Sequence, residues 1–536
     1  MAYSEAVQVA KAKYPKTVTK TIKYGTAGFR TKADELDFIM YRMGLLATLR
    51  ARDTKAVIGV MITASHNPEP DNGVKLIDPM GEMLAPAWET HATTLANATD
   101  DGIAEAMATI AKEAGGIKED GKALVFVGRD TRPSSDRLRD AVVAGVKAAG
   151  GEVKDFGVVS TPILHFVVTC HNDGGEYGEP TEEGYYKKIA EAFAKLRVSG
   201  ASRGNYEPTV LFDGANGVGA IMMERFTQYL GDSIKSTMYN KGEGVLNHLC
   251  GADYVKVQQK WPEGVPQAHN TRCVSVDGDA DRVIYSFIDK NGKYSMLDGD
   301  KIATLVAGYF QELLKASGLT LKLGLVQTAY ANGASTAYIT EKLGVPVACA
   351  KTGVKHLHHV ALQFDIGVYF EANGHGTVIF SKNAREAIRN AAQANESAQK
   401  LSQVMDVINE TVGDAISDML LVETVLHARE WSIEDWNSAY ADLPNRQMKV
   451  TVADRAVITT TDAERVCVTP AGLQDTINSI VAKYPNGRSF VRPSGTEDIV
   501  RVYAEASTQE GADNLAIAVG NAVYEQAGGV GDRPKI

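Results

Sequence analysis

The sequence predicts an α/β protein with three repeated domains of mixed or parallel sheets and a smaller C-terminal α+β domain. Two patterns lead to this prediction. Apolar strands alternate with amphipathic helices along most of the chain, which is typical of largely parallel sheets covered by helices on both faces. The C-terminal segment instead contains shorter strands and helices. A length of 536 residues is also that of three or four ordinary domains.

The repeated unit is an apolar strand, a turn rich in Gly or Asn, and an amphipathic helix. The first example is the strand 123–128, followed by a helix that begins near Ser134 and stops at Gly150. The second is the strand 210–213, with a helix that places Met222 and Phe226 on one face. In the third, the strand 323–326 and the turn 331–334 precede a helix through Tyr338. Three copies along one chain predict three repeated domains.

Domain boundaries are expected where residues that favour turns gather. Such segments lie at 173–184, at 289–292 and near Pro444. They predict domains at 1–182, 183–295, 296–440 and 441–536. Within the last domain, short strands and helices are expected at 447–452, 457–460, 472–481 and 499–506.

The composition narrows the class of protein. A net charge of −10 argues against nucleic acid as a partner, because binding the phosphate backbone needs a dense basic surface. It leaves room for a small phosphorylated ligand, which a few arginines can hold. No run of 18 apolar residues and no signal-peptide pattern is present, so no contact with a membrane is expected. Nothing in the sequence indicates an obligate protein partner.

The five cysteines show no CxxC spacing, which argues against a thiolate zinc site, and their odd number argues against a disulfide framework. Free thiols are typical of a reducing compartment. The sequence therefore predicts a cytoplasmic protein.

Ser65 is the first candidate for a chemical role. The segment Met61–Pro68 follows the apolar strand 56–60, and an exposed Ser at a strand end, in a loop restrained by Pro68, is well placed to act as a nucleophile. The adjacent His66 does not by itself make a catalytic triad. On this segment alone, a nucleophile and a mere capping residue are equally good interpretations of Ser65.

Three aspartates form a more specific pattern. Asp277, Asp279 and Asp281 follow the apolar strand 273–276. Alternate carboxylates separated by small residues can converge on one hard cation, and such oxygen ligands suit Mg²⁺. An EF-hand calcium loop would need Gly at its sixth position, where Arg282 stands. A solvated acidic turn is the remaining alternative, and it is disfavoured because carboxylates packed this closely repel one another without a cation.

A third segment, 492–498, has the composition of a phosphate cradle. It combines the forked guanidinium of Arg492, the hydroxyls of Ser494 and Thr496, and Gly495, which frees backbone amides. An ordinary polar turn is the alternative. Two further loops are weaker candidates, and a surface turn is the better interpretation of each by itself: the segment 371–376, which offers hydroxyl-directed acceptors and a histidine, and the segment 24–30, which ends in Arg30.

Taken together and in this order, these segments strongly resemble the α-D-phosphohexomutase superfamily. The runs TASHNP, DGDADR and RPSGTED carry the resemblance, which extends from about Tyr24 to Ala506. It implies four domains around a central cleft, which contribute a serine, a metal, a sugar and a phosphate loop.

One branch of the superfamily is favoured. The sugar loop reads E-A-N-G-H-G from Glu371, whereas glucose and mannose mutases more usually resemble E-x-S-G-H, and Asn373 would leave space for an acetamido group. The runs GVMITASHNPEPDNGVKLIDPMGEML and GEYGEPTEEGYY also resemble the branch that acts on N-acetylglucosamine phosphate.

The resemblance implies an activity and its cofactors. The activity is interconversion of N-acetylglucosamine 6-phosphate and 1-phosphate through a phosphoserine and a sugar 1,6-bisphosphate, feeding the synthesis of UDP-N-acetylglucosamine. The cofactors are Mg²⁺ and the sugar 1,6-bisphosphate. The metal ligands implied are the aspartates and the phosphorylated serine: Asp277, Asp279, Asp281 and Ser65.

The resemblance also implies roles for the other loop residues. The residues expected around the transferring phosphoryl group are Ser65, His66, Lys75, Arg30, Arg282 and His375, and the general base is left open among Lys75, His375 and His66. The residues expected to bind the phosphosugar are Thr352, Gly353, Glu371, Asn373, Gly374, Arg492, Ser494, Gly495 and Thr496.

Three alternatives share parts of this pattern. A phosphoglucomutase or phosphomannomutase would use the same chemistry on a different sugar. A metal-dependent phosphatase would release inorganic phosphate and need no bisphosphate. A non-catalytic sugar-phosphate sensor on the same fold would have little reason to keep Ser65 together with all three aspartates.

Overall fold

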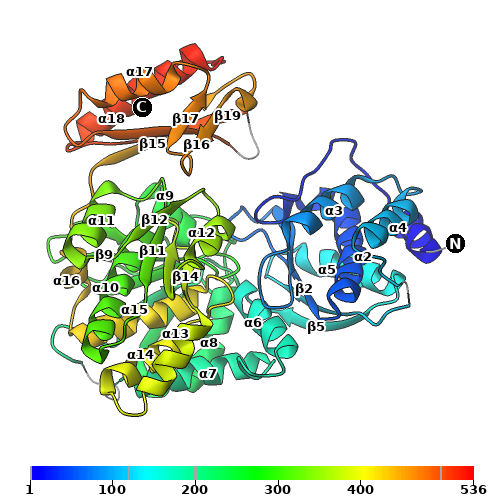
Figure 1. Ribbon diagram of the computed structural model, residues 1–536, viewed down its shortest axis with the longest axis horizontal. Coiled ribbons are helices and arrows are strands. Elements are labelled where there is room, and N and C mark those ends of the chain that lie inside the picture. Colours follow the sequence, from blue (N-terminus) through cyan, green and yellow to red (C-terminus); the bar gives the residue numbers. More distant parts are fainter. Residues whose placement is uncertain (1–2, 119, 198–201, 495–497, 536) are drawn as a thin grey trace. The chain divides into compact units, whose positions relative to one another are not determined.

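A computed structural model describes residues 3–118, 120–197, 202–494 and 498–535 (Figure 1). The chain divides into two compact units. The first consists of Met1–Asp298, Asn373–Thr377 and Lys400–Glu434, and the second of Gly299–Ala372, Val378–Gln399 and Asp435–Ile536.

The first sheet has the strand order β1-β3-β2-β4-β5. Strands β2, β4 and β5 are parallel, whereas β3 runs antiparallel to both β2 and β1. The strands are β1 (Phe29–Lys32), β2 (Ile58–Ile62), β3 (Asp71–Ile77), β4 (Leu124–Arg129) and β5 (Glu152–Val158). The helices are α1 (Ser4–Lys13), α2 (Asp37–Thr54), α3 (Pro86–Asn97), α4 (Ile103–Glu113), α5 (Ser135–Ala148) and α6 (Thr161–Asn172).

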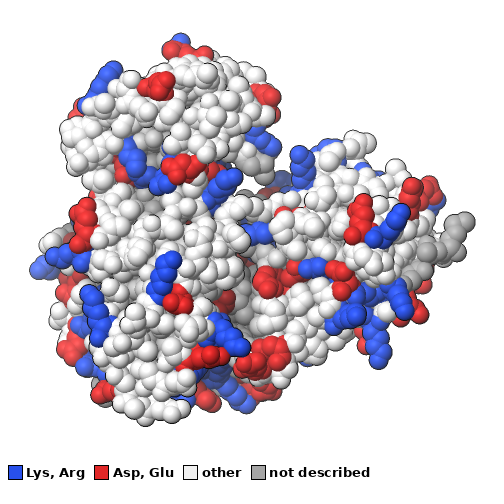
Figure 2. All heavy atoms as spheres, in the orientation of Figure 1, with Lys and Arg blue, Asp and Glu red and all other residues white. Residues whose placement is uncertain are grey.

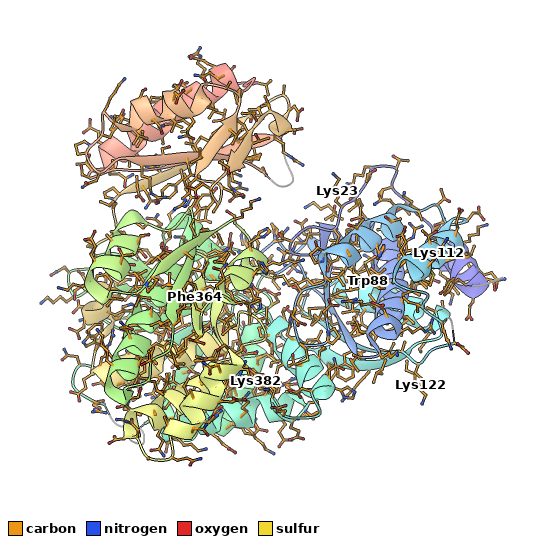
Figure 3. All side chains as sticks on the ribbon, viewed as in Figure 1. Lys23, Trp88, Lys112, Lys122, Phe364 and Lys382 are labelled. Carbon is orange, nitrogen blue, oxygen red and sulfur yellow. The ribbon has the colours of Figure 1, made fainter. Side chains whose placement is uncertain are left out.

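The core of this first domain lies between the sheet and its helices. Trp88 on α3 is buried there, and the guanidinium carbon of Arg50 lies 5.0 Å from its ring centre (Figure 3). The predicted strand 123–128 and the helix after Ser134 are confirmed as β4 and α5. The predicted strand 56–60 is shifted: β2 runs to Ile62, because Met61 and Ile62 remain paired with β3 and β4.

The second sheet has the order β10-β9-β8-β6-β7, in which β6, β7 and β8 are parallel and β9 runs antiparallel to both of its neighbours, β8 and β10. The strands are β6 (Thr209–Asp213), β7 (Lys235–Tyr239), β8 (Arg272–Val276), β9 (Val283–Ile288) and β10 (Tyr294–Leu297). The helices are α7 (Glu182–Lys195), α8 (Val218–Leu230) and α9 (Ala252–Gln258). Helix α15 (Ala415–Arg429) also packs here, and its buried Glu423 pairs with Arg272 at 2.8 Å.

The third sheet has the order β12-β11-β13-β14, and β11 is parallel to β12 and β13. The strands are β11 (Leu323–Thr328), β12 (Val347–Ala350), β13 (Ile366–Phe370) and β14 (Gly376–Phe380). The α-helices of this part of the chain are α10 (Gly299–Ser317), α11 (Gly333–Ala337), α12 (Val354–Ala361), α13 (Lys382–Ala391), α14 (Glu396–Val407) and α16 (Ile433–Asn437). The predicted helix through Tyr338 is α11 followed by a π-helical segment, Tyr338–Leu343.

The C-terminal part contains an antiparallel sheet of order β15-β19-β18 and a two-stranded ribbon, β16-β17. The elements are β15 (Asn445–Thr451), β16 (Thr459–Thr461), β17 (Val466–Thr469), α17 (Leu473–Val481), β18 (Arg488–Pro493), β19 (Ile499–Glu505) and α18 (Gln509–Gln526). Helices α17 and α18 cover one face of the sheet (Figure 1). The α+β prediction is confirmed, although Val457 ends a short 3-10 helix rather than beginning a strand.

Three further observations concern the surface, the thiols and the helices. Acidic and basic side chains are interspersed on the face drawn in Figure 2. All five cysteines are free, as the sequence predicts. Among the residues that the structure describes, no helix is both long and apolar enough to cross a membrane.

Candidate active site

The structure brings Ser65 to the aspartate loop. Ser65 follows the end of β2, is buried, and its Oγ donates a hydrogen bond of 2.6 Å to Oδ2 of Asp277. The same Oγ lies 3.4 Å from Oδ1 of Asp281. Residues more than 200 positions apart in the sequence therefore meet at one point, where the first and second sheets carry their loops.

The aspartate loop joins β8 to the antiparallel strand β9. It closes on itself, because Oδ1 of Asp277 accepts hydrogen bonds from the amides of Asp281 and Arg282, both at 3.1 Å. Gly278 must be small here, since a Cβ on it would lie 2.6 Å from the carbonyl oxygen of Ser65. The serine loop and the aspartate loop are thus in direct contact.

Asp277, Asp279 and Asp281 fit a divalent cation. All three are buried, and each offers a carboxylate oxygen within 4.8 Å of the others. Oδ1 of Asp279 is buried and accepts no hydrogen bond within the described part of the chain. A buried, unpaired carboxylate oxygen is costly without a donor or a cation. A cluster of hard oxygen atoms is the ligand set that Mg²⁺ prefers.

Lys75 and Arg282 surround the cluster with positive charge. Lys75 on β3 donates to Asp279 at 3.2 Å and to Asp281 at 3.1 Å, and Arg282 lies 3.8 Å from Asp277. Burial and the carboxylates of Asp281 and Asp279 raise the pKa of Asp277 well above its ordinary value. Although burial opposes it, Asp279 and Asp281 hold the pKa of Lys75 above its ordinary value.

Arg30, His66 and His375 complete this group. Burial and Arg282 lower the pKa of Arg30 on β1, and its Nε has no hydrogen-bond partner among the described residues. Burial, Arg282 and Arg30 lower the pKa of His66 well below its ordinary value. The Nδ1 atom of His375 lies 2.5 Å from the carbonyl oxygen of Asp281, so His375 also contacts the aspartate loop.

The sugar loop connects β13 to β14. Its Gly374 has a φ of +86°, and a Cβ there would lie 2.0 Å from the carbonyl oxygen of Val283, so the loop fits closely against the start of β9. Asn373 accepts a hydrogen bond of 3.0 Å from the amide of His375. Glu371, which follows β13, accepts one of 2.9 Å from the amide of Gly353.

Arg492 on β18 lies near two groups from other elements. Its Nε donates to the hydroxyl of Tyr330 at 3.2 Å, and its Nη1 donates to Glu464 at 3.0 Å. Thr352 donates to the same Glu464 carboxylate, from its amide at 3.0 Å and from its hydroxyl at 2.5 Å. Ser494 is buried beside this strand. The predicted residues Gly495 and Thr496 lie outside the described residues.

The predicted site residues thus fall into two groups. Ser65, the three aspartates and the residues around them belong to the first compact unit, together with Asn373 and Gly374. Thr352, Gly353, Glu371, Arg492 and Ser494 belong to the second. The roles assigned to all of them stay predictions.

Sequence reasoning missed several residues of this arrangement. Thr161 donates to Asp279 at 2.6 Å, and Glu464 pairs with Arg492. Arg501 stands opposite Arg492 in the register of β18 and β19, which adds a second guanidinium to that part of the sheet. Only Arg501 had a signal in the sequence, an arginine shortly after the RPSGTED run.

Comparison with known families first defines the class of protein. The model "Phosphoglucomutase/phosphomannomutase, alpha/beta/alpha domain I" matches residues 45–103 and 91–177, and the corresponding C-terminal domain model matches residues 447–521. These matches agree with a serine and a buried aspartate cluster carried on repeated α/β domains. The chain is therefore of the phosphohexomutase class.

Further matches define the family within this class. The models "Phosphoacetylglucosamine mutase AMG1, domain II" and "domain III" match residues 178–284 and 298–431. Phosphoacetylglucosamine mutase of Sus scrofa is 54% identical over 99% of this chain and 99% of its own length. The chain belongs to the phosphoacetylglucosamine mutase family, in the α-D-phosphohexomutase superfamily that the sequence motifs indicate.

Two solved structures of the Aspergillus fumigatus N-acetylphosphoglucosamine mutase are similar throughout. One, in complex with GlcNAc-6P and magnesium, is 46% identical, covers 98% of this chain and 99% of its own, and has a TM-score of 0.93. The other, a serine-to-alanine variant in complex with glucose 1,6-bisphosphate, is 47% identical over 99% of both chains, with a TM-score of 0.92.

Proposed function

We propose that this protein interconverts N-acetylglucosamine 6-phosphate and N-acetylglucosamine 1-phosphate through a phosphate carried by Ser65. The observation that carries the proposal is the contact of 2.6 Å between Oγ of Ser65 and Asp277, in a chain that belongs over its whole length to the phosphoacetylglucosamine mutase family. A hydroxyl held against a buried carboxylate cluster is suited to receive and to give a phosphoryl group.

Asp277, Asp279 and Asp281 would hold Mg²⁺. The buried Oδ1 of Asp279, which accepts no hydrogen bond from the described residues, supports this assignment because a cation would satisfy it. When bound, Mg²⁺ supplies positive charge against the negative charge of the phosphoryl group. Arg30 on β1, Lys75 on β3 and Arg282 in the aspartate loop add further positive charge. The phosphoryl group on Ser65 and the sugar hydroxyl that receives it would therefore meet where these positive charges surround the aspartates.

The chemical step moves one phosphoryl group. The O1 hydroxyl of N-acetylglucosamine 6-phosphate loses its proton to a base, the bond from phosphorus to Oγ of Ser65 breaks, and a bond from phosphorus to O1 forms. Oγ of Ser65 then recovers a proton. His66, Lys75 and His375 are the candidates for the base, and the choice among them stays open.

The product of this step is the sugar 1,6-bisphosphate, which must turn end over end before it returns its 6-phosphate to Ser65. Arg492 and Ser494, with the predicted Gly495 and Thr496, would bind the phosphate that is not being transferred. Glu371, Asn373, Thr352 and Gly353 would position the sugar. Each end of the bisphosphate has to fit both subsites. Because the bisphosphate can give a phosphoryl group to an unphosphorylated Ser65, added sugar 1,6-bisphosphate should stimulate the enzyme.

A cytoplasmic location and the absence of a nucleic-acid, membrane or obligate protein partner stay part of the proposal. The five free cysteines support a reducing compartment. The domain division 1–182, 183–295, 296–440 and 441–536 is proposed on the same terms, with one functional loop from each domain.

The proposal is tested by the mass of the intact protein and by tracing its phosphate. Purified protein should carry one phosphate at Ser65, and label from [³²P]glucose 1,6-bisphosphate should pass to the protein and then to the sugar. Ser65→Ala should lose both, whereas Ser134→Ala, which changes a hydroxyl outside the aspartate cluster, should keep them. Isomerisation with no label on the protein would refute the covalent relay.

Metal and sugar dependence are tested separately. Chelation should stop isomerisation, and added Mg²⁺ should restore it. Turnover of N-acetylglucosamine 6-phosphate should exceed that of glucose 6-phosphate. Equal or better use of glucose 6-phosphate would favour a glucose mutase, and steady release of inorganic phosphate would favour a phosphatase.

A further inference from the structure

The backbone of Ser65 is held in an unusual conformation. Its φ is +52°, in the left-handed region that residues other than Gly, Asn and Asp rarely adopt. The conformation turns the side chain toward Asp277 and leaves both the amide and the carbonyl of Ser65 to be satisfied by the surrounding structure. What fixes these two backbone groups therefore fixes the direction of Oγ.

Arg132 holds the carbonyl side. It lies in the loop between β4 and α5, its side chain is fully buried, and it donates to four carbonyl oxygens of the segment 65–71, which comprises the serine loop and the first residue of β3. The acceptors are Ser65 at 2.9 Å, Asn67 at 2.9 Å, Pro68 at 2.8 Å and Asp71 at 3.0 Å. The remaining N–H, on Nε, donates to Asp130 at 3.0 Å. All five N–H donors of the guanidinium are thus used, and four of them bind the segment 65–71.

Asp130 holds the amide side. Its Oδ2 accepts a hydrogen bond of 2.8 Å from the hydroxyl of Thr63, and that hydroxyl in turn accepts one of 2.9 Å from the amide of Ser65. The same carboxylate orients Arg132. One buried acidic group therefore reaches the amide of Ser65 through Thr63 and its carbonyl through Arg132.

Asn247 reaches the same carbonyl from the second domain. Its Nδ2 donates to Ser65 at 2.8 Å and to Asn67 at 3.0 Å. Asn247 lies in the segment 240–251, before α9, and not on either of the two loops that it joins. The carbonyl of Ser65 thus has one donor from the first domain and one from the second.

We propose that Arg132, oriented by Asp130, is a positioning residue that keeps Oγ of Ser65 directed at the aspartate cluster, and that Asn247 shares this task. The inference rests on the proposed function, in which Ser65 carries the phosphate. Among the described residues, the hydrogen-bond partners of Oγ of Ser65 are Asp277 and Asp281, and none of these three side chains is among them. Their effect is on the placement of the nucleophile, where a displacement of about 1 Å can lower a rate by roughly two orders of magnitude.

Arg132→Lys is the decisive variant, because it keeps the charge and loses the forked donors. The matched control is Arg42→Lys. Arg42 is also a fully buried arginine of the first domain, and within the described residues its hydrogen-bond acceptors are the carbonyls of Leu95, Ala96 and Ala98 and the carboxylate of Asp100, none of them in the serine loop. Both changes are expected to lower the melting temperature, so thermal stability alone does not separate the two roles.

The readout that separates them is the rate of phosphate uptake by Ser65 from glucose 1,6-bisphosphate with saturating Mg²⁺, per folded molecule, together with kcat and KM. Arg132→Lys should lower the uptake rate and kcat by about 100-fold and leave KM within about twofold. Arg42→Lys should keep wild-type values of all three. An Arg132→Lys protein with wild-type uptake per folded molecule would overturn the inference.

Asn247→Ala provides the second test, and it decides the question if Arg132→Lys does not fold. It should also lower the uptake rate at unchanged KM, and its effect should not add to that of Arg132→Lys, because both donors act on one carbonyl. Additive effects, or no effect of Asn247→Ala, would count against a shared positioning role. Failure of the wild-type protein to take up phosphate at Ser65 would instead refute the proposed function.

Discussion

The carboxylate of Glu464 pairs with the guanidinium of Arg492, which is expected to bind phosphate. Glu464 lies in the turn between β16 and β17, where Asp462, Ala463 and Glu464 all have positive φ values. Its carboxylate accepts hydrogen bonds from Arg492 and Thr352, two residues assigned to the phosphosugar. A carboxylate and a phosphate are both anions that fit a guanidinium fork. A substrate phosphate that binds Arg492 would therefore have to displace Glu464.

This competition makes Glu464→Gln a test with a definite sign. Removing the negative charge weakens the pair with Arg492 and removes repulsion of the phosphate, so affinity for N-acetylglucosamine 6-phosphate should rise. Because the pair is partly exposed, the expected gain is about three- to tenfold in Kd. Isothermal titration with the unphosphorylated Ser65→Ala background measures it.

Asp462→Asn is the control for this experiment. Asp462 belongs to the same turn, but its carboxylate pairs with Arg465 rather than with Arg492. It should leave the affinity for the phosphosugar unchanged. Weaker binding by Glu464→Gln would mean that Glu464 orients Arg492 for the phosphate instead of competing with it.

The side chain of His165 is expected to make the stability of the protein depend on pH. It is buried on α6, its Nδ1 lies 2.7 Å from the carbonyl oxygen of Gly81, and burial lowers its pKa to about 4. The unfolded chain binds this proton near pH 6.5, whereas the folded protein binds it only near pH 4. The contribution of neutral His165 to the free energy of unfolding is therefore fully present above pH 6.5 and is lost as the pH falls toward 4.

His165→Asn should therefore flatten the acid limb of the stability curve. Asn can still donate to Gly81, but it does not titrate. Between pH 7 and pH 4.5, the free energy of unfolding should fall by about 2–3 kcal/mol less in the variant than in the wild type, the difference due to one proton. Urea unfolding at the two pH values measures this. Parallel curves for the two proteins would show that His165 is not the group responsible.

At this scale, local sequence signals predicted what is local. Ser65 and the three aspartates could be predicted because they directly follow apolar strands in the sequence. Arg132, Asn247 and Glu464 carry no such signal, because each acts on a residue that is distant in the sequence. Asn247, for example, meets Ser65 across a separation of 182 positions. Such contacts are consequences of the assembled domains and not of any pattern along the chain.

At the scale of elements, α2 and α5 pack closely against each other. Two glycines make it possible: a Cβ on Gly145 would lie 2.0 Å from the carbonyl oxygen of Tyr41, and one on Gly44 would lie 2.2 Å from that of Val142. Both neighbours are backbone atoms, which cannot rotate away. The two helices can keep their separation only while these positions have no side chain.

Gly145→Ala should therefore destabilise the protein at the upper end of the range of about 1–3 kcal/mol for overpacked sites, or beyond it. A lower urea midpoint is the measurement. Gly121→Ala is the matched control in the same domain, since its added Cβ would come no closer than 3.4 Å to its neighbours, the side chain of Arg52 and the carbonyl oxygen of Lys118. Equal stability of the two variants would contradict the close packing of the helices.

The strands that the sequence predicted in the first three sheets are central strands, but burial alone did not decide the outcome, because the fully buried strands β9, β13 and β14 were not predicted. β4, β6, β8 and β11 are central strands of their sheets and read as continuous apolar runs. The edge strands β7 and β10 are partly exposed and carry mixed sequences, so periodicity gave no signal for them. Helix α15 was missed for a different reason: it is buried all round, which removes the amphipathic pattern that marks a surface helix.

At the scale of the whole molecule, sequence order and spatial packing diverge. The segment 400–434 belongs to the first compact unit although it follows the third sheet in the chain. Glu423 in this segment accepts hydrogen bonds from Arg272 and Tyr285 of the second sheet and from Tyr206, which precedes β6. No local pattern predicts that the second sheet, whose last strand ends at Leu297, is covered by a helix that begins at Ala415.

The C-terminal part is the opposite case. Its core is formed by residues between Val450 and Ala527 alone, packed between the sheet β15-β19-β18 and helices α17 and α18. A fragment spanning 441–536 keeps this core complete and has the size of a small independent domain. A fragment spanning 183–295 lacks Glu423, and it leaves the buried Arg272 without its partner.

The two fragments should consequently behave differently. The fragment 441–536 should fold by itself and show a cooperative thermal transition by circular dichroism. The fragment 183–295 should not, because an unpaired buried charge costs about 3–5 kcal/mol, which is comparable to the whole stability of a small domain. Adding the segment 400–434 through a flexible linker should restore cooperative unfolding to it, and Glu423→Ala in that segment should abolish the rescue. If the fragment 183–295 folded equally well without the added segment, α15 would not be part of the second domain's core.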